Sequence, residues 1–311
     1  MTGVTVRVPA KINLQLAVGP RRADGYHDLV TVFHAVSLFD EVTVAVADGP
    51  GPDHVLVSGE GAGAVPAGGD NLALKAAAAL AKAAGVTRDP ARPLEITIRK
   101  RIPVAAGLAG GSADAAAALV ACNELWGTGF SQEQLKEVAA EVGSDVAFAL
   151  MGGTAVGQGR GERLTPALAS GEYHWVLAVA DGQLSTPEVY ATLDRLRAGR
   201  DPVPPRLDNA LMGALRSGEA PAVGRALSND LQPAAISLFP ALRGALAAGH
   251  EFGALGAIVA GSGPTCVFLA ADADRAVDLA VSLSGAGVCR AVARAAGPAP
   301  GATVVEPPAG A

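Results

Sequence analysis

Alternating apolar and polar positions mark the first predicted strands. Residues 4–8 (VTVRV) and 41–47 (EVTVAVA) alternate with a period of two, the pattern of a half-buried β-strand. The polar, turn-rich residues 19–29 lie between them and predict a loop. Residues 93–103 (PLEITIRKRIP) predict a further strand that ends at Pro103.

Strong helix formers predict three helices in the same half of the chain. Residues 71–85 are rich in alanine and leucine and end on a glycine, which suits a helix C-terminus. A second helix is expected to start near Ser112 or Ala113 and to run to about Trp126. Residues 131–143 predict a third, with a serine placed to cap its start.

The second half of the chain begins with a strand near His174 and shows no internal repeat. Because strands and helices do not alternate strictly along the chain, the sequence favours an α+β fold over a doubly wound parallel sheet. The elements predicted here are a strand over 174–180, helices over 187–196, 209–217, 219–227 and 240–248, a strand–turn–strand unit over 256–271, a helix over 273–287 and a strand over 289–297.

Length and composition predict two packed domains. The chain has 311 residues, of which 50% are apolar and 17% charged, and this length exceeds what one ordinary core holds. A polar, small-residue-rich segment places a boundary near 160–172. We therefore expect a first domain over 1–168, a second over 169–296, and a loose tail rich in Pro, Gly and Ala over 297–311.

Charge and apolar runs exclude several classes of function. The formal net charge of −6 argues against general nucleic-acid binding, which needs a basic face. The N-terminus has no apolar signal region, and the apolar stretch 252–271 is broken by GSGPT, so we expect a cytoplasmic protein without a membrane span. Cys122, Cys266 and Cys289 are odd in number and widely spaced, which predicts neither a disulfide framework nor a zinc site.

A glycine-rich stretch, PVAAGLAGGSADAAAAL over 103–119, joins a predicted strand to a predicted helix. A helix N-terminus presents unpaired N–H groups and partial positive charge, so it can hold phosphate without a lysine. The hydroxyl of Ser112 could add a contact to phosphate or to magnesium. Neither GxxxxGK[ST] nor GxGxxG is present, and on this stretch alone a phosphate cradle and a flexible turn both remain open.

Three further groups of polar residues could carry chemistry. Lys11 and Asn13 stand two apart in an expected strand and therefore share one face, as a donor pair or an ordinary exposed face. Tyr26 could stack on a planar base while His27 hydrogen-bonds the edge of that base, or the two residues could belong to a turn capped by a half-buried tyrosine. Asp145 begins an apolar helical run and is either a helix cap or a carboxylate that orients an attacking hydroxyl.

Taken together, these segments resemble the GHMP kinases. The resemblance covers residues 10–268. The glycine-rich loop has one extra residue between GL and Ser112, and in this it is similar to the branch of the family that acts on a diphosphocytidyl substrate. Four motifs carry it, in the order seen in the family: PAKINLQL (9–16), DGYHDLVTVF (24–33), PVAAGLAGGSADAAAAL (103–119) and AGSGPTCVF (260–268).

The resemblance implies an N-terminal nucleotide domain of the ribosomal S5 domain 2-like type and a C-terminal ferredoxin-like α/β sandwich that closes the substrate pocket. It implies ATP, with Mg²⁺, as cofactor. The implied reaction phosphorylates the 2-hydroxyl of 4-diphosphocytidyl-2-C-methyl-D-erythritol in the non-mevalonate isoprenoid pathway. The expected partners are this small molecule and ATP, with no nucleic acid or membrane, in a monomer or weak homodimer; no metal ligands are assigned.

The resemblance also implies roles for individual residues. Asp145 would be the catalytic carboxylate, and Lys11 would pair with it and with the transferring phosphate. The implied substrate residues are Asn13, Tyr26, His27, Thr186 and Tyr190, with the two tyrosines stacking on cytosine. On the nucleotide side, Asn71, Leu72 and Lys100 would surround adenine, and the other implied residues are Pro103, Gly107, Leu108, Gly110, Gly111, Ser112, Gly261, Ser262 and Gly263.

Some positions depart from the family pattern. Ala105, Ala106 and Ala109 stand where relatives often carry glycine, which predicts a stiffer phosphate loop with fewer accessible shapes. Asp114 stands where some relatives carry asparagine; a second carboxylate near phosphate would repel it unless magnesium intervenes, so a metal role for Asp114 stays open. A basic loop that includes Arg21 and Arg22 is either an attractor for the substrate diphosphate or a solvated turn.

Two other functions stay open at this point. A GHMP kinase for homoserine or mevalonate is disfavoured by the Tyr26–His27 pair, because those substrates carry no base. A non-catalytic nucleotide-binding regulator is disfavoured by the presence of both Asp145 and Lys11.

Overall fold

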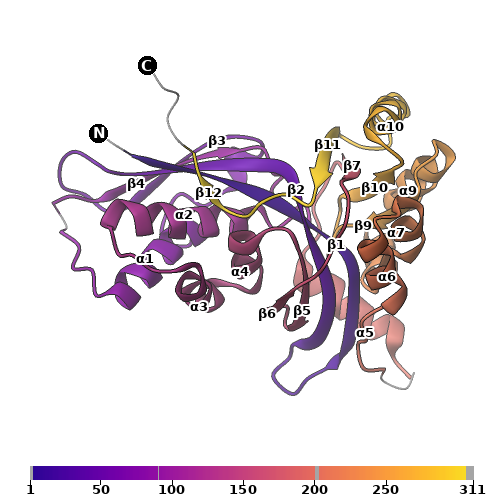
Figure 1. Cartoon of the computed structure of the whole chain (residues 1–311), viewed down its shortest axis with the longest axis horizontal. Helices are drawn as coiled ribbons and strands as arrows, with labels where there is room; N and C mark the ends of the chain where they lie inside the picture. Colours follow the sequence, from indigo (N-terminus) through magenta and orange to yellow (C-terminus); the bar gives the residue numbers. More distant parts are fainter. Residues whose placement is uncertain (1–2, 90, 200–202, 306–311) are drawn as a thin grey trace.

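The computed structural model describes residues 3–89, 91–199 and 203–305 (Figure 1). Its first part forms a mixed sheet covered on one face by helices. The elements of this part are β1 (Val4–Arg21), β2 (His27–Val46), β3 (His54–Gly59), the 3₁₀ turn η1 (Ala62–Ala64), α1 (Leu72–Ala84), β4 (Leu94–Lys100), α2 (Gly110–Trp126), α3 (Gln132–Val142), α4 (Ser144–Met151), β5 (Thr154–Gly159) and β6 (Arg163–Pro166).

The β1–β2 hairpin is the spine of this first sheet. The sheet runs in the order β12-β1-β2-β4-β3, and β5 and β6 extend it at the far end of β2. Three irregularities shift the register of the hairpin, and one of them lies between Asn13 and Gln15. The long hairpin bends there, and its tip reaches past the first group of helices to lie beside β5, β6 and α5 (Figure 1).

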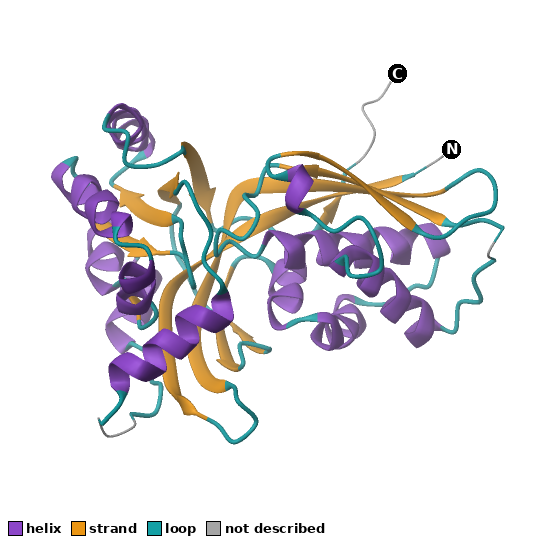
Figure 2. Cartoon of the chain, turned by 180° about the vertical axis from the view of Figure 1, so that it is seen from behind, coloured by secondary structure: helices purple, strands orange, loops and turns teal. Residues whose placement is uncertain are grey.

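Helices α1 to α4 lie together on one face of the first sheet (Figure 2). The central one, α2, is a run of alanines, and its side chains are buried on nearly every side. Small side chains allow this helix to approach both the strands and α1 closely, so the chain fills its core with few aromatic residues.

The second part of the chain is a four-stranded antiparallel sheet in the order β11-β7-β10-β9, with helices on its outer face (Figure 1). This order and the β–α–β–β–α–β succession match a ferredoxin-like sandwich, and the α+β class is confirmed. Its elements are β7 (Tyr173–Val179), α5 (Thr186–Arg197), α6 (Asn209–Ser217), α7 (Ala220–Ala226), β8 (Ser228–Asn229), α8 (Gln232–Leu238), α9 (Ala241–Glu251), β9 (Gly256–Val259), β10 (Cys266–Ala270), α10 (Ala273–Gly285), β11 (Ala291–Gly297) and β12 (Thr303–Val304).

The two sheets share one apolar core. Side chains of β7 and β10, among them Trp175 and Leu269, belong to the same buried cluster as the first-sheet strands. Two short strands from the second part also join the first sheet: β8 pairs with β1, and so does β12. The change from one sheet to the other falls between Pro166 and Tyr173, but the parts are not independent bodies. Within the described residues, no helix is both long enough and apolar enough to cross a bilayer.

Several sequence expectations need correction. The loop expected over 19–29 is only a short turn, because β1 continues to Arg21 and β2 starts at His27. The tail expected to be loose from Gly297 is ordered through residue 305: Ala299 is buried and β12 pairs with β1. Gly152 and Gly301 make this packing possible, since a Cβ on Gly152 would lie 2.1 Å from the backbone nitrogen of Gly301, and a Cβ on Gly301 would lie 2.2 Å from the carbonyl oxygen of Leu150. Residues 306–311 lie outside the described part.

A buried histidine makes the fold sensitive to acid. His34 is fully buried, and its Nδ1 lies 2.8 Å from the hydroxyl of Thr154. Burial lowers the pKa of His34 to about 3. In the unfolded chain the His34 imidazole is protonated below about pH 6.5, whereas in the folded chain it stays neutral down to about pH 3. Acidification from pH 6.5 towards 3 therefore favours unfolding.

Between pH 7.5 and pH 5, we expect His34 to lower the free energy of unfolding by about 2 kcal/mol. Urea unfolding of the wild type and of His34→Gln at both values measures this, and the variant should lose that part of the acid slope. The exposed His250→Gln serves as the control and should keep the slope. Equal slopes in all three proteins would contradict the assignment.

Candidate active site

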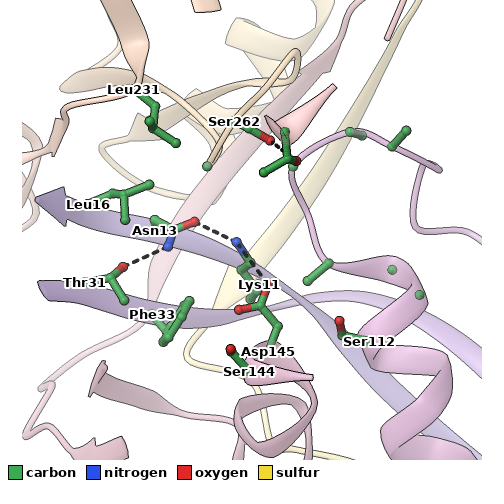
Figure 3. Close-up of a pocket in the computed structure, with 18 of the residues that line it drawn as sticks. Lys11, Asn13, Leu16, Thr31, Phe33, Ser112, Ser144, Asp145, Leu231 and Ser262 are labelled. Atoms are coloured by element: carbon green, nitrogen blue, oxygen red, sulfur yellow. Dashed lines mark hydrogen bonds and ion pairs between the residues drawn. The ribbon is translucent and has the colours of Figure 1, made fainter. Parts of the chain in front are cut away.

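A cavity of about 540 Å³ opens where the two parts of the chain meet. Strands β1 and β2, the loop before α2, the start of α4, helix α5 and the turn after β9 all contribute to its wall (Figure 3). Of the residues implied by the resemblance, it brings together Lys11, Asn13, Leu72, Gly107, Gly110, Gly111, Ser112, Asp145, Thr186, Tyr190, Gly261 and Ser262.

Lys11 lies in this wall, and its ammonium group begins a chain of hydrogen bonds (Figure 3). Its Nζ donates to Oδ1 of Asn13 at 2.7 Å, and Nδ2 of Asn13 donates to the hydroxyl of Thr31 at 2.8 Å. The Thr31 hydroxyl donates in turn to the carbonyl of Gln15 at 2.7 Å. Strand alternation places Lys11 and Asn13 on one face, and hydrogen bonding from β1 to β2 fixes their side chains.

Asp145 lies opposite Lys11, in the first turn of α4. Its Oδ2 is 3.8 Å from Nζ of Lys11, and about a third of its side chain is exposed. Burial lowers the pKa of Lys11, and the negative charge of Asp145 opposes this shift. The pair therefore presents one cation and one accessible carboxylate to the cavity.

The phosphate loop reaches the cavity at the start of α2, which begins at Gly110 and not at Ser112 or Ala113 as predicted. Ala105 and Ala109 have φ values of 53° and 59°, the left-handed region that favours glycine. The loop thus keeps a glycine-like path at these alanines. At Gly107 a side chain is excluded outright, because a Cβ would lie 2.1 Å from the carbonyl oxygen of Ala260.

The turn after β9 forms the opposite wall. Gly261 has a φ of 52°, and a Cβ built on it would lie 3.4 Å from Oδ1 of Asn13 and 3.5 Å from Nζ of Lys11. The hydroxyl of Ser262 lies 2.9 Å from that of Thr186 at the start of α5 (Figure 3). The backbone of this turn therefore lies against the Lys11–Asn13 pair.

A smaller cavity of about 280 Å³ adjoins the main one on the other side of the phosphate loop. Asn71 and Lys100 line it, but both side chains have structural partners. Asn71 accepts from the N–H of Ala73 and so caps α1. The Lys100 ammonium is 2.7 Å from Asp114 and also contacts Asp40. Adenine contacts of Asn71 and Lys100 stay predictions, and direct contact with the Lys100 ammonium would compete with two ion pairs.

Other implied residues lie outside the main cavity wall. Pro103 and Leu108 are buried under the loop, and the carbonyl of Leu108 accepts from the N–H of Lys11. Gly263 packs on Val259, where a Cβ would approach to 2.9 Å. These three residues support the site and do not line it.

The expected base site is only partly assembled. Tyr190 lines the cavity and lies 5.1 Å, centroid to centroid, from the ring of His27. His27 is buried, and its Nε2 is 2.8 Å from Oδ1 of Asp194. Tyr26 is 54% exposed, and the guanidinium of Arg160 lies 3.7 Å from the centre of its ring. A base that stacks on this face of Tyr26 would have to displace Arg160.

Sequence reasoning missed Arg160, Ser144, Thr31 and Phe33 as cavity residues. Thr31 and Phe33 lie at the end of the DGYHDLVTVF motif on β2, in the part of that strand that pairs with β1 between Asn13 and Leu16, and strand alternation could have identified them. Arg160 comes from the β5–β6 hairpin, and no local pattern signals that this turn reaches the cavity.

Comparison with known proteins agrees with this geometry. The model of the GHMP kinases N terminal domain matches residues 71–153, and that of the GHMP kinases C terminal domain matches residues 211–289. The chain belongs to the GHMP kinase family. Both matched regions include cavity residues, the phosphate loop in the first and the Gly261 turn in the second.

Several relatives of this GHMP kinase share one name. It is 55% identical to a 4-diphosphocytidyl-2-C-methyl-D-erythritol kinase of Thermobifida fusca, over 98% of this chain and 99% of the relative. A kinase of the same name from Nocardia farcinica is 56% identical, with 98% and 97% covered. A crystal structure of 4-(cytidine 5'-diphospho)-2C-methyl-D-erythritol kinase has a TM-score of 0.74 and 34% identity, with 94% and 98% covered.

A cluster of three buried ionisable residues, Lys100, Asp40 and Asp114, lies under the phosphate loop and holds one cation for two carboxyl groups. Lys100 meets two buried carboxylates, and Oδ1 of Asp114 has no hydrogen-bond partner among the described residues. Burial, with the added charge of Asp40, raises the pKa of Asp114 to about 7, against the opposing effect of Lys100. Because the folded state holds this proton more tightly than the unfolded state, the stabilisation is complete below pH 3.8 and is lost as the pH rises to 7.

Asp114→Asn should therefore raise the melting temperature relative to wild type, by an amount that grows between pH 4 and pH 7. The amide oxygen can still accept from Lys100, and the cluster becomes neutral. We expect a gain of about 3 °C or more at pH 8, measured by thermal unfolding across the pH range. The exposed Asp48→Asn is the control and should show no trend. A constant or negative difference for Asp114→Asn would refute the account.

Proposed function

We propose that this GHMP kinase transfers the γ-phosphate of ATP to the 2-hydroxyl of 4-diphosphocytidyl-2-C-methyl-D-erythritol, giving ADP and the 2-phosphate in the non-mevalonate isoprenoid pathway. The observation that carries the mechanism is the Lys11–Asp145 pair at 3.8 Å, set between the phosphate loop and the Gly261 turn. Relatives of the same name, 55% identical over nearly the full length, support the choice of substrate.

ATP would bind with its phosphates at the N-terminus of α2. Gly110, Gly111 and Ser112 line the cavity there, and the first N–H groups of a helix have no intrahelical partners. The adjoining cavity beyond Leu72 is the space for the adenine ring. This arrangement directs the γ-phosphate towards Lys11.

Asp145 orients the acceptor hydroxyl and takes its proton as the new P–O bond forms and the bond to the β-phosphate oxygen breaks. A tertiary alcohol is a poor acid, so its proton must leave as phosphate transfer proceeds. Lys11 neutralises charge that moves onto the transferring oxygens, and Asn13 holds the ammonium in place by its 2.7 Å hydrogen bond. Positioning and charge neutralisation supply most of the rate.

Mg²⁺ would be held chiefly by the phosphate oxygens of ATP, with one or two ligands from the protein. The Ser112 hydroxyl faces the cavity at the start of α2 and is a suitable oxygen donor. Asp114 does not fit this role, because its side chain is buried against Lys100. Bound there, the ion would neutralise phosphate charge.

The fold alone does not choose among family substrates. Homoserine kinase from Cytophaga hutchinsonii and the mevalonate kinase of L. major have TM-scores of 0.74 and 0.73, at 18% and 16% identity. Those likenesses support only the shared fold. The cytidyl substrate is favoured because the ring of Tyr190 lines the cavity with the ring of His27 5.1 Å behind it, and homoserine or mevalonate has no base to stack there.

The proposal is tested by ADP release with the cytidyl alcohol, homoserine or mevalonate, with and without magnesium. We expect turnover only with the cytidyl alcohol and only with magnesium present. Turnover with another alcohol would reassign the substrate, and ATP binding without any turnover would point to a regulator.

Asp145→Asn should lower kcat about 100-fold or more and leave the KM values of both substrates within threefold, because it removes the proton acceptor and keeps the shape. Steady-state kinetics measures both constants, and the exposed Glu141→Gln on the neighbouring helix is the matched control. Near-normal turnover of Asp145→Asn would show that the carboxylate has no such role.

Asp194 should affect recognition of the base through His27. If Nε2–H donates to the Asp194 carboxylate, Nδ1 is left as an acceptor, which suits the exocyclic amino group of cytosine and not the carbonyl of uracil. Asp194→Ala should raise KM for the cytidyl alcohol about tenfold, leave KM for ATP unchanged, and reduce the preference over the uridyl analogue. Competition kinetics with both analogues checks this; an unchanged preference would contradict it.

A further inference from the structure

Asn229 lies outside every motif recognised in the sequence, yet it touches three separate parts of the site. It belongs to the two-residue strand β8, which pairs in parallel with β1 at Gln15 and Leu16. The next residue anchors this short strand further. The N–H of Asp230 donates to the carbonyl of Leu16 at 2.9 Å, and the Asp230 carboxylate accepts from the N–H of Val18 at 2.8 Å. Asn229 is therefore held at a fixed place relative to β1.

The side-chain amide of Asn229 bridges from this anchor to the turn after β9. Its Nδ2 donates to the carbonyl of Val259 at 2.8 Å and to the carbonyl of Gly261 at 2.7 Å. Its Oδ1 accepts from the N–H of Leu231 at 2.9 Å. Both amide hydrogens and the amide oxygen are thus used. Gly261 and Leu231 themselves line the cavity.

The turn that Asn229 holds lies against the Lys11–Asn13 pair. A Cβ on Gly261 would lie 3.5 Å from Nζ of Lys11, so a shift of the turn by an ångström would alter the space above the ammonium. The described residues show two other side-chain ties of this segment, the Ser262–Thr186 contact and a hydrogen bond from the N–H of Val259 to Oε1 of Gln232 at 2.9 Å. Both are made to helices of the second part, α5 and α8. Asn229 ties the turn to β1, the strand that carries Lys11 and Asn13.

We propose that Asn229 is a positioning residue for phosphoryl transfer, which sets the distance between the Gly261 turn and the Lys11–Asn13 pair. The proposal rests on the proposed function, since it assigns a role within the same reaction. Misplacement of reacting groups by about 1 Å costs on the order of 100-fold in rate. The ATP and cytosine ends of the cavity lie on other elements, so loss of Asn229 should act on kcat and spare substrate binding.

The decisive variant is Asn229→Asp. It preserves shape and the acceptor for Leu231, but it replaces both donors with a carboxylate oxygen that faces two carbonyls. We expect kcat to fall 10- to 100-fold while KM for ATP and for the cytidyl alcohol changes less than threefold. Asn229→Ala removes the same donors without adding charge, and it should reproduce the kcat loss.

The matched control is Asn123→Asp. Asn123 also fixes a loop through its amide, accepting from the N–H of Phe130 at 3.0 Å and donating to the carbonyl of the same residue, but that loop is remote from the cavity. This variant should lower the melting temperature and leave kcat within threefold. Asn229 variants with wild-type kcat, or with a kcat loss matched by Asn123→Asp at equal stability, would overturn the proposal. Absence of wild-type turnover would instead overturn the function itself.

Discussion

The buried ammonium group of Lys11 is the constraint around which the site is built. A cation removed from water is costly unless polar partners replace its hydration. Asn13 on β1 accepts directly from the ammonium, Thr31 on β2 accepts from the amide of Asn13 and so holds it in place, and α4 brings Asp145 within 3.8 Å of Nζ. These residues come from three different elements, so the site forms only when the hairpin and α4 are in their final places. Folding and assembly of the charge pair are the same event.

A second buried lysine supports the phosphate loop from below. Lys100 ends β4 and draws Asp40 of β2 and Asp114 of α2 together, and Asp40 also accepts from the N–H groups of Arg101 and Ile102. This cluster connects the sheet to the first turns of α2. The helix N-terminus is thereby held near Lys11, which explains how a loop without its own lysine can face a cation from a distant strand.

The sequence was sufficient for the parts of the site that depend on local pattern. Alternation put Lys11 and Asn13 on one face, and helix signals put Asp145 in a first turn; the structure brings all three to one cavity. It was not sufficient for contacts that depend on tertiary approach. Arg160 reaches Tyr26 from a hairpin 134 residues further along the chain, and Asn229 acts through a strand of two residues. The ordered tail was missed because its pairing with β1 is long-range and its composition resembles a linker.

The glycine pattern of the phosphate loop shows which positions need glycine for space and which only for backbone freedom. Ala105 and Ala109 occupy left-handed conformations, at a cost of about 1–2 kcal/mol each. Ala105 is exposed and Ala109 is half-buried, so neither methyl group is enclosed by the core. Gly107 differs, since the carbonyl of Ala260 fills the place of its Cβ. That contact joins the phosphate loop to the strand end that leads into the Gly261 turn. The steric requirement at Gly107 therefore arises from the junction between the two sheets. The close contact with Ala260 fixes the position of the phosphate loop relative to the Gly261 turn.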